Sequence, residues 1–205
     1  MQDKSRLVGA VVFTFVPLTA FIFTKRDILK ALIRKPSRRD VGIGIGFGFL
    51  CVVISMAVTL FMRIAGGGNV ASNSVFGTLA NSPAEMMIAM LIQLFGEELL
   101  TLILFLFFFQ LFRRCLKTRS TGILLAWLVS AVIFGLLHYP AYLNWAHVIC
   151  VIGLARLILS LSFLKTKNLT ASYISHLTDD FTSVGIVFAV ALSSAAGTGV
   201  AAGFI

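Results

Sequence analysis

Two adjacent glutamates, Glu97 and Glu98, lie within the apolar segment LIQLFGEELLTLILFLFFFQLF at residues 91–112. Burying a carboxylate in the middle of a bilayer costs about 2.5 kcal/mol or more, so intramembrane carboxylates usually face a wet or paired internal site. On a helix, adjacent side chains point about 100° apart and cannot both be directed at one atom. We therefore expect one of the two glutamates to do chemistry while the other is held by a structural partner.

Imidazole and carboxylate side chains also occur in two later apolar segments. His176 and Asp180, in SHLTDD, are four residues apart and share a helix face, whereas Asp179 is expected to point elsewhere. His138 ends the run SAVIFGLLH four residues after Phe134, so the aromatic ring should lie one helical turn below the imidazole. Three segments thus each offer a polar face, a distribution typical of a catalytic site or a transport path.

The segments that carry these residues are predicted to be membrane-spanning helices. The chain is 59% hydrophobic and 12% charged, with a mean hydropathy of +0.99, far from the composition of a soluble domain. We predict an all-α, polytopic transmembrane helical bundle that forms a single integral membrane domain over residues 1–205. With roughly 20 apolar residues needed for each crossing, the sequence contains about six candidate spans, at 7–24, 41–63, 86–112, 121–141, 146–164 and 169–192.

The net charge of +9 does not indicate a nucleic-acid partner, because the basic residues cluster between the predicted spans. Segment 25–39 carries seven Lys and Arg residues, 113–119 four and 165–167 two, whereas 66–85 carries none. The positive-inside rule places the three basic segments in the cytoplasm and the N-terminus outside. Two basic residues near the N-terminus favour the opposite start, so the first apolar segment either crosses the bilayer or lies in its interface. His147, close to Trp145 at a span end, is expected to be an interfacial anchor or a helix-end polar group.

The chain reads EELLTL at 97–102, FGLLH at 134–138 and HLTDD at 176–180. These motifs resemble the CAAX protease and bacteriocin-processing family of intramembrane proteases, also called the Abi family. Its pattern is E-E-x-x-x-R on one helix, F-x-x-x-H on the next and H-x-x-x-N/D on a later one. Each motif alone is weak, but the ordered set of three is fairly specific. The resemblance covers residues 86–182, which would carry the catalytic core, and implies a peptide hydrolase in the cell membrane of a bacterium.

The resemblance also implies a role for each motif residue. Glu97 and His138 would activate a water molecule that attacks a peptide carbonyl, with Glu98 as the second residue of the acidic pair. His176 and Asp180 would stabilise the tetrahedral oxyanion. Since an ionised carboxylate cannot donate a hydrogen bond, Asp180 must either be protonated or orient His176 as the donor.

One position departs from the family pattern. The family's arginine falls on Leu102, which removes the countercharge that it would supply to the glutamates. Arg156, inside a later span, either supplies this charge from another helix or extends its side chain to the cytoplasmic interface. Two other functions therefore remain open besides an active protease: an inactive family member acting as a membrane adaptor or immunity protein, and a proton-coupled transporter.

A metal site is an alternative to chemistry by side chains alone. Glu97, His138 and His176 form a His/His/carboxylate set, which is the ligand combination of several hydrolytic zinc sites. We favour the metal-free site, because the adjacent glutamates lack the i, i+4 ligand spacing of an H-E-x-x-H helix. The expected partners are the lipid bilayer and a hydrophobic or membrane-anchored peptide, as in the peptide maturation, bacteriocin processing or self-immunity of bacterial family members.

Overall fold

The computed structural model describes residues 2–66 and 83–195, and within these ranges every regular element is helical. Most of the predicted uncharged loop at 66–85 lies outside the described residues. Helices that are long and apolar enough to cross a membrane include Arg6–Phe23, Arg38–Ile64, Ala84–Cys115, Arg119–Leu137 and Trp145–Thr166. The predicted all-helical transmembrane bundle is therefore confirmed.

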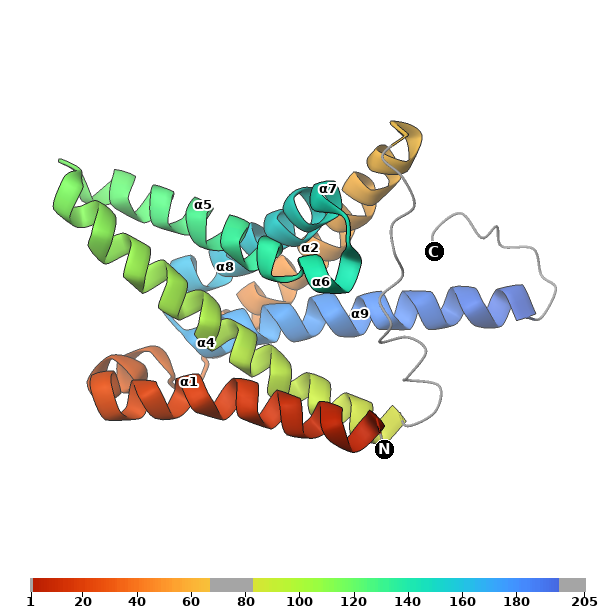
Figure 1. Cartoon of the computed structure of the whole chain (residues 1–205), viewed down its shortest axis with the longest axis horizontal. Helices are drawn as coiled ribbons and strands as arrows, with labels where there is room; N and C mark the ends of the chain where they lie inside the picture. The colour runs from red at the N-terminus through yellow and green to blue at the C-terminus, as the bar shows by residue number, and fades with distance from the viewer. Residues whose placement is uncertain (1, 67–82, 196–205) are drawn as a thin grey trace.

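The predicted spans correspond to successive helical elements (Figure 1). In chain order these are α1 (Gln2–Leu32), α2 (Arg38–Ile64), α4 (Pro83–Cys115), α5 (Arg119–Leu137), α6 (Tyr139–Tyr142), α7 (Trp145–His147), the π-helix η1 (Val148–Gly153), α8 (Leu154–Thr166) and α9 (Leu169–Ala195). The sixth predicted span, 169–192, forms α9, which is long enough to cross a membrane but is not among the apolar candidates. The histidine and two aspartates in its first half interrupt its apolar run.

Helix α9 lies closely against α2 because two glycines of α2 leave room for it. A Cβ atom on Gly48 would lie 2.5 Å from the Cβ of Thr178 and 2.6 Å from the carbonyl oxygen of Ser175. Gly46, on another face of α2, would meet nothing within 4 Å. The glycine-rich segment GIGIGFG therefore permits a close backbone approach on one face, and this approach fixes the half of α9 that carries the predicted site residues.

The connection from α5 to α8 differs from the predicted one. The predicted span 121–141 ends early, at Leu137, and the segment predicted at 146–164 begins with α7 and a π-helical turn rather than a regular helix. Gly135 explains part of this arrangement, because a Cβ atom there would collide with the carbonyl oxygen of Val148 in η1. Single π-helical turns are rare and frequently occur at functional sites.

The basic segments gather at one end of the bundle. The α1–α2, α4–α5 and α8–α9 connections lie on the left of Figure 1, and the end of α2, the start of α4 and the end of α9 lie on the right. All three connections fall in the basic segments of the sequence. Below, this end is called the basic end, and the other the opposite end.

Candidate active site

Glu98 forms a buried ion pair with Arg156. The Nη2 atom of Arg156, on α8, lies 2.7 Å from Oε1 of Glu98, on α4, and each side chain is only 1% exposed. The guanidinium also donates from Nε to Ser160 Oγ at 3.4 Å and lies 5.1 Å from the ring centroid of Phe134. Of the two alternatives that the sequence left open for Arg156, the structure has the countercharge and not the interfacial side chain.

Leu102 occupies the position at which the family pattern has an arginine. It lies one turn after Glu98 on α4, is 3% exposed and lines a small cavity together with Glu98 and Arg156. Residues four apart on a helix are neighbours on its surface. The positive charge missing from α4 is therefore supplied to the same place by α8.

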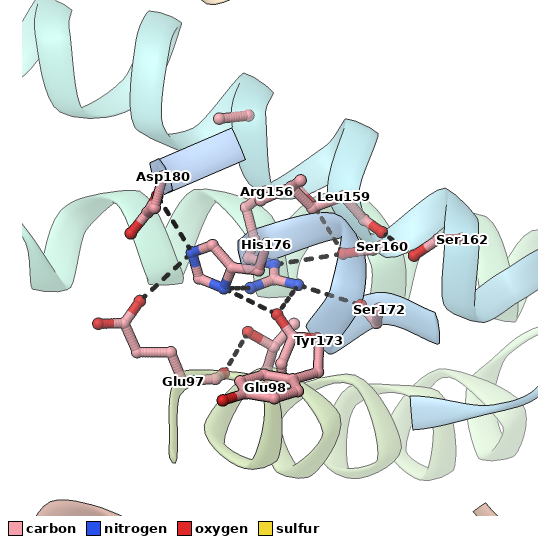
Figure 2. Close-up of polar contacts among 12 residues, drawn as sticks. Glu97, Glu98, Arg156, Leu159, Ser160, Ser162, Ser172, Tyr173, His176 and Asp180 are labelled. Atoms are coloured by element: carbon pink, nitrogen blue, oxygen red, sulfur yellow. Dashed lines mark hydrogen bonds and ion pairs between the residues drawn. The ribbon is translucent and has the colours of Figure 1, made fainter. Parts of the chain in front are cut away.

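His176 lies between the two glutamates (Figure 2). Its Nδ1 atom is 2.9 Å from Glu98 Oε1, which only accepts hydrogen bonds when ionised, so Nδ1 carries the proton. On the other side of the ring, Nε2 lies 3.8 Å from Glu97 Oε2 and 3.9 Å from Asp180 Oδ1. The spacing argument thus correctly placed His176 and Asp180 on one face, and the structure brings that face to the glutamate pair.

Glu97 differs from Glu98 in its surroundings. Gln93, one turn earlier on α4, donates from Nε2 to Glu97 Oε1 at 3.0 Å, and the Thr101 hydroxyl donates to the Glu97 carbonyl oxygen at 2.9 Å. Glu97 lines a large cavity of about 680 Å³, whereas Glu98 lines the small cavity beside Arg156. Glu98 is thus held by a cation, as expected for the structural member of the pair, and Glu97 lines the large cavity, while the chemical role of Glu97 stays a prediction.

His138 reaches the same large cavity from the end of α5. Its Nδ1 atom lies 2.9 Å from the carbonyl oxygen of Phe134, and its ring centroid lies 4.6 Å from that of Phe134, as the four-residue spacing predicts. Because a carbonyl oxygen only accepts, Nδ1 holds a proton, and a neutral His138 has its lone pair on Nε2. His138 lies in the cavity wall with Glu97, and no described contact joins the two side chains directly.

Two further acidic or imidazole residues lie in the cavity wall. Asp179 lines the large cavity together with Asp180, but within the described residues only Asp180 forms an ion pair with His176, so the expectation that Asp179 points away from that shared face stays a prediction. His147 is 5% exposed, its ring centroid lies 4.7 Å from that of Tyr142, and it ends α7 in the cavity wall, so of its two expected roles the structure has the helix-end polar group. The turn of η1 after α7 places it there, and helical spacing carries no signal for such a turn.

The predicted zinc ligands Glu97, His138 and His176 all lie in the cavity wall. Over residues 2–66 and 83–195, however, no group of three or more His, Cys, Asp or Glu side chains is arranged to hold a metal ion. These residues do not fit as a ligand set in this geometry, and the metal-free site that the sequence favoured stays a prediction.

Comparison with known proteins gives one match. The family model described as type II CAAX prenyl endopeptidase Rce1-like matches residues 79–182. This range runs from just before α4 to the middle of α9 and contains every side chain of the Glu97–Glu98–Arg156–His176–Asp180 group together with His138. No curated protein and no solved structure matches the chain.

Proposed function

Because the chain belongs to the type II CAAX prenyl endopeptidase Rce1-like family, we propose that it is an intramembrane endopeptidase whose attacking water molecule is activated by Glu97. The observation that carries this proposal is the asymmetry of the adjacent glutamates. Glu98 is neutralised by Arg156 at 2.7 Å, whereas Glu97 faces a cavity of about 680 Å³ and its ion-pair partner among the described residues is the more distant Nε2 of His176, at 3.8 Å. A general base must keep its lone pairs available to the reacting molecule.

The reaction follows from the positions of the lone pairs and protons. Glu97 takes a proton from water while the water oxygen bonds to the carbonyl carbon of the substrate and the carbonyl π pair moves to the oxygen. The C–N bond then breaks as the carbonyl re-forms, and Glu97 gives its proton to the leaving nitrogen. His138 accepts the second water hydrogen at Nε2 and so orients the attacking oxygen. A shared water molecule also suits the 3.8 Å between Glu97 Oε2 and His176 Nε2, which is too long for a direct hydrogen bond.

His176 is the donor to the tetrahedral oxyanion in this proposal. Its Nδ1 proton is already used on Glu98, so the ring must be an imidazolium cation to donate from Nε2. The carboxylates of Glu97 and Asp180, 3.8 and 3.9 Å from Nε2, balance that charge. This geometry supports the second of the two predicted roles for Asp180, which is to orient His176. A fixed donor of this kind is often the largest single contribution to catalysis of acyl transfer.

The large cavity supports an extended peptide as substrate. Its wall follows one face of each of three helices, from 52 to 63 on α2, from 86 to 97 on α4 and from 176 to 187 on α9. At about 1.5 Å of rise per residue each stretch covers roughly 16 Å, the length of about five extended residues. The flexible side chains of Met56, Met86 and Met90 offer adaptable apolar contacts in the cavity wall, which suit a hydrophobic or membrane-anchored peptide.

The same stretches indicate from which side the substrate arrives. Glu97 and His176 lie at the inner ends of their stretches, and the outer ends lie toward the opposite end of the bundle, away from the basic end. If the basic end is cytoplasmic, the cavity admits peptides from the non-cytoplasmic side. Peptide maturation, bacteriocin processing or self-immunity in a bacterial cell membrane is part of this proposal and rests on the resemblance of the motifs.

A comparison of cells tests the proposal. Cells with the wild-type chain and cells with Glu97→Gln, at matched membrane levels, are compared by mass spectrometry of the peptide termini in membranes and medium. We expect a set of new C-termini that is present only with the wild type. Identical sets of termini, together with a phenotype that survives Glu97→Gln, would point instead to the adaptor or immunity protein.

A further inference from the structure

A third hollow lies at the basic end of the bundle, and none of its lining residues lines the large cavity with Glu97. It has a volume of about 380 Å³ and is called the basic hollow below. Its lining comes from the α1–α2 connection, the first turns of α2 and the end of α8. The lining residues are Arg34, Lys35, Ser37, Arg39, Asp40, Ile43, Lys165 and Thr166. Four of them are cationic and one is acidic.

Hydrogen bonds between distant segments hold the wall of the basic hollow. Arg34 donates from Nη2 to the carbonyl oxygen of Thr166 at 2.9 Å, and the Thr170 hydroxyl donates to the carbonyl oxygen of Arg34 at 3.2 Å. The amide of Asn168, which is fully buried, donates to Asp40 Oδ2 at 3.4 Å. The α1–α2 connection is thus hydrogen-bonded to the α8–α9 turn, and cations of both segments line the same hollow.

The single carboxylate in the basic hollow has another partner. Asp40 Oδ2 accepts from the backbone N–H of Ser37 at 3.0 Å, and Ser37 Oγ accepts from the N–H of Asp40 at 3.1 Å, which together cap the start of α2. Within the described part of the chain, none of the four cations forms an ion pair with a carboxylate. All four cations are exposed, and Lys165 Nζ also lies 5.8 Å from the centroid of the Phe47 ring. Like charges gathered around one hollow repel each other, and a bound anion relieves that repulsion.

We propose that the basic hollow binds the phosphate group of an anionic phospholipid. Arginine and lysine side chains are the usual protein partners of phosphate. The position of the basic hollow favours a lipid as the source of the phosphate group. The hollow lies where α2 begins and α8 ends, which is at the depth of the lipid headgroups if these helices cross the bilayer. Basic pockets between spans on the cytoplasmic side bind anionic headgroups, and the cytoplasmic leaflet is the anionic one. The site is independent of Glu97 and of the proposed proteolysis.

Native mass spectrometry of the purified full chain tests this inference. The probes are phosphatidylglycerol, phosphatidylcholine with the same acyl chains, and inorganic phosphate. The double variant Arg39→Gln/Lys165→Gln removes two cations of the basic hollow, neither of which holds its wall by a described hydrogen bond. The matched control, Arg113→Gln/Arg114→Gln, removes two exposed cations of another basic segment.

The wild type and the control should bind phosphatidylglycerol alike, and the hollow variant, which lacks two cations, should bind it roughly 30-fold more weakly. Phosphatidylcholine should bind more weakly than phosphatidylglycerol to the wild type. Equal losses in the two double variants, or no loss in either, overturn the proposal. Inorganic phosphate binding as tightly as the lipid would overturn the lipid assignment. The charge-preserving variant Arg39→Lys/Lys165→Arg should retain binding, which separates loss of charge from loss of the fold.

Discussion

Arg156 of α8 and Glu98 of α4 lie 2.7 Å apart in the interior of the bundle, and the two charges come from helices that are separate in the sequence. Removing one partner of a buried ion pair leaves an uncompensated charge and costs about 3–5 kcal/mol. Glu98 is therefore committed to holding α4, α8 and the His176 ring in place. In the proposed mechanism, its neighbour Glu97 remains for the reaction.

Moving the positive charge from Arg156 on α8 to residue 102 on α4 tests the structural role of the Glu98–Arg156 ion pair. We expect Arg156→Leu to lower the free energy of unfolding by about 3–5 kcal/mol. Adding Leu102→Arg to that variant should recover part of the loss, because residue 102 lies one turn from Glu98 and lines the same small cavity. Thermal unfolding in detergent measures both. The single variant Leu102→Arg is the control and should destabilise the protein through repulsion from Arg156. An Arg156→Leu protein as stable as wild type would contradict the structural role of the pair.

The glycine face of α2 gives a second prediction. Gly48→Ala places a methyl group 2.5 Å from Thr178 Cβ and 2.6 Å from the Ser175 carbonyl oxygen, so α9 must move away from α2. We expect a loss of about 1–3 kcal/mol in the free energy of unfolding, as for other overpacked cores, and a loss of cleavage because His176 moves with α9. Gly46→Ala, with nothing within 4 Å, is the matched control and should behave as wild type. Equal behaviour of the two alanine variants would show that this face does not set the position of α9.

Cysteine labelling determines from which side of the membrane the large cavity is accessible. Cys115 is exposed at the basic end, whereas Thr59 lines the large cavity on the part of α2 toward the opposite end. With Cys150 replaced by serine, we compare Cys115 with Thr59→Cys in a background that also lacks Cys115. Cys51, which is buried in both proteins, serves as a shared internal control.

A maleimide that cannot cross membranes should label Thr59→Cys in intact cells and label Cys115 only after the cells are permeabilised. The reverse pattern would mean that the cavity opens to the cytoplasm. That result would leave the catalytic proposal intact, because labelling does not depend on cleavage.

Sequence spacing predicted the parts of the site that depend on one helix at a time. The 100° between adjacent positions predicted different surroundings for Glu97 and Glu98, and the i, i+4 spacing joined His176 to Asp180. Arg156 could not be decided in this way, because its partner is on another helix and the sequence does not say which helix faces meet. The structure supplies that contact at 2.7 Å.

Other features depend on irregular backbone or on the width of a cavity. His147 is brought into the cavity wall by the π-helical turn that follows it, and no periodic pattern in the sequence marks such a turn. Asp179 shares the cavity with Asp180 because the cavity is wider than one helix face. The ring orientation of His138 depends on a hydrogen bond to the Phe134 carbonyl oxygen, at the point where α5 ends before its predicted boundary.

The central claim, that Glu97 is the base and Glu98 is structural, is tested most directly by the cleavage rate of a purified pair of glutamine variants. The substrate is the peptide whose termini depend on the wild-type chain in cells, and equal amounts of folded protein are compared. Glu97→Gln should lower kcat by about 10²–10⁴-fold, and Glu98→Gln should lower the unfolding temperature more than Glu97→Gln does, because Glu98 is the partner of Arg156. A Glu97→Gln protein that cleaves at the wild-type rate would contradict the account.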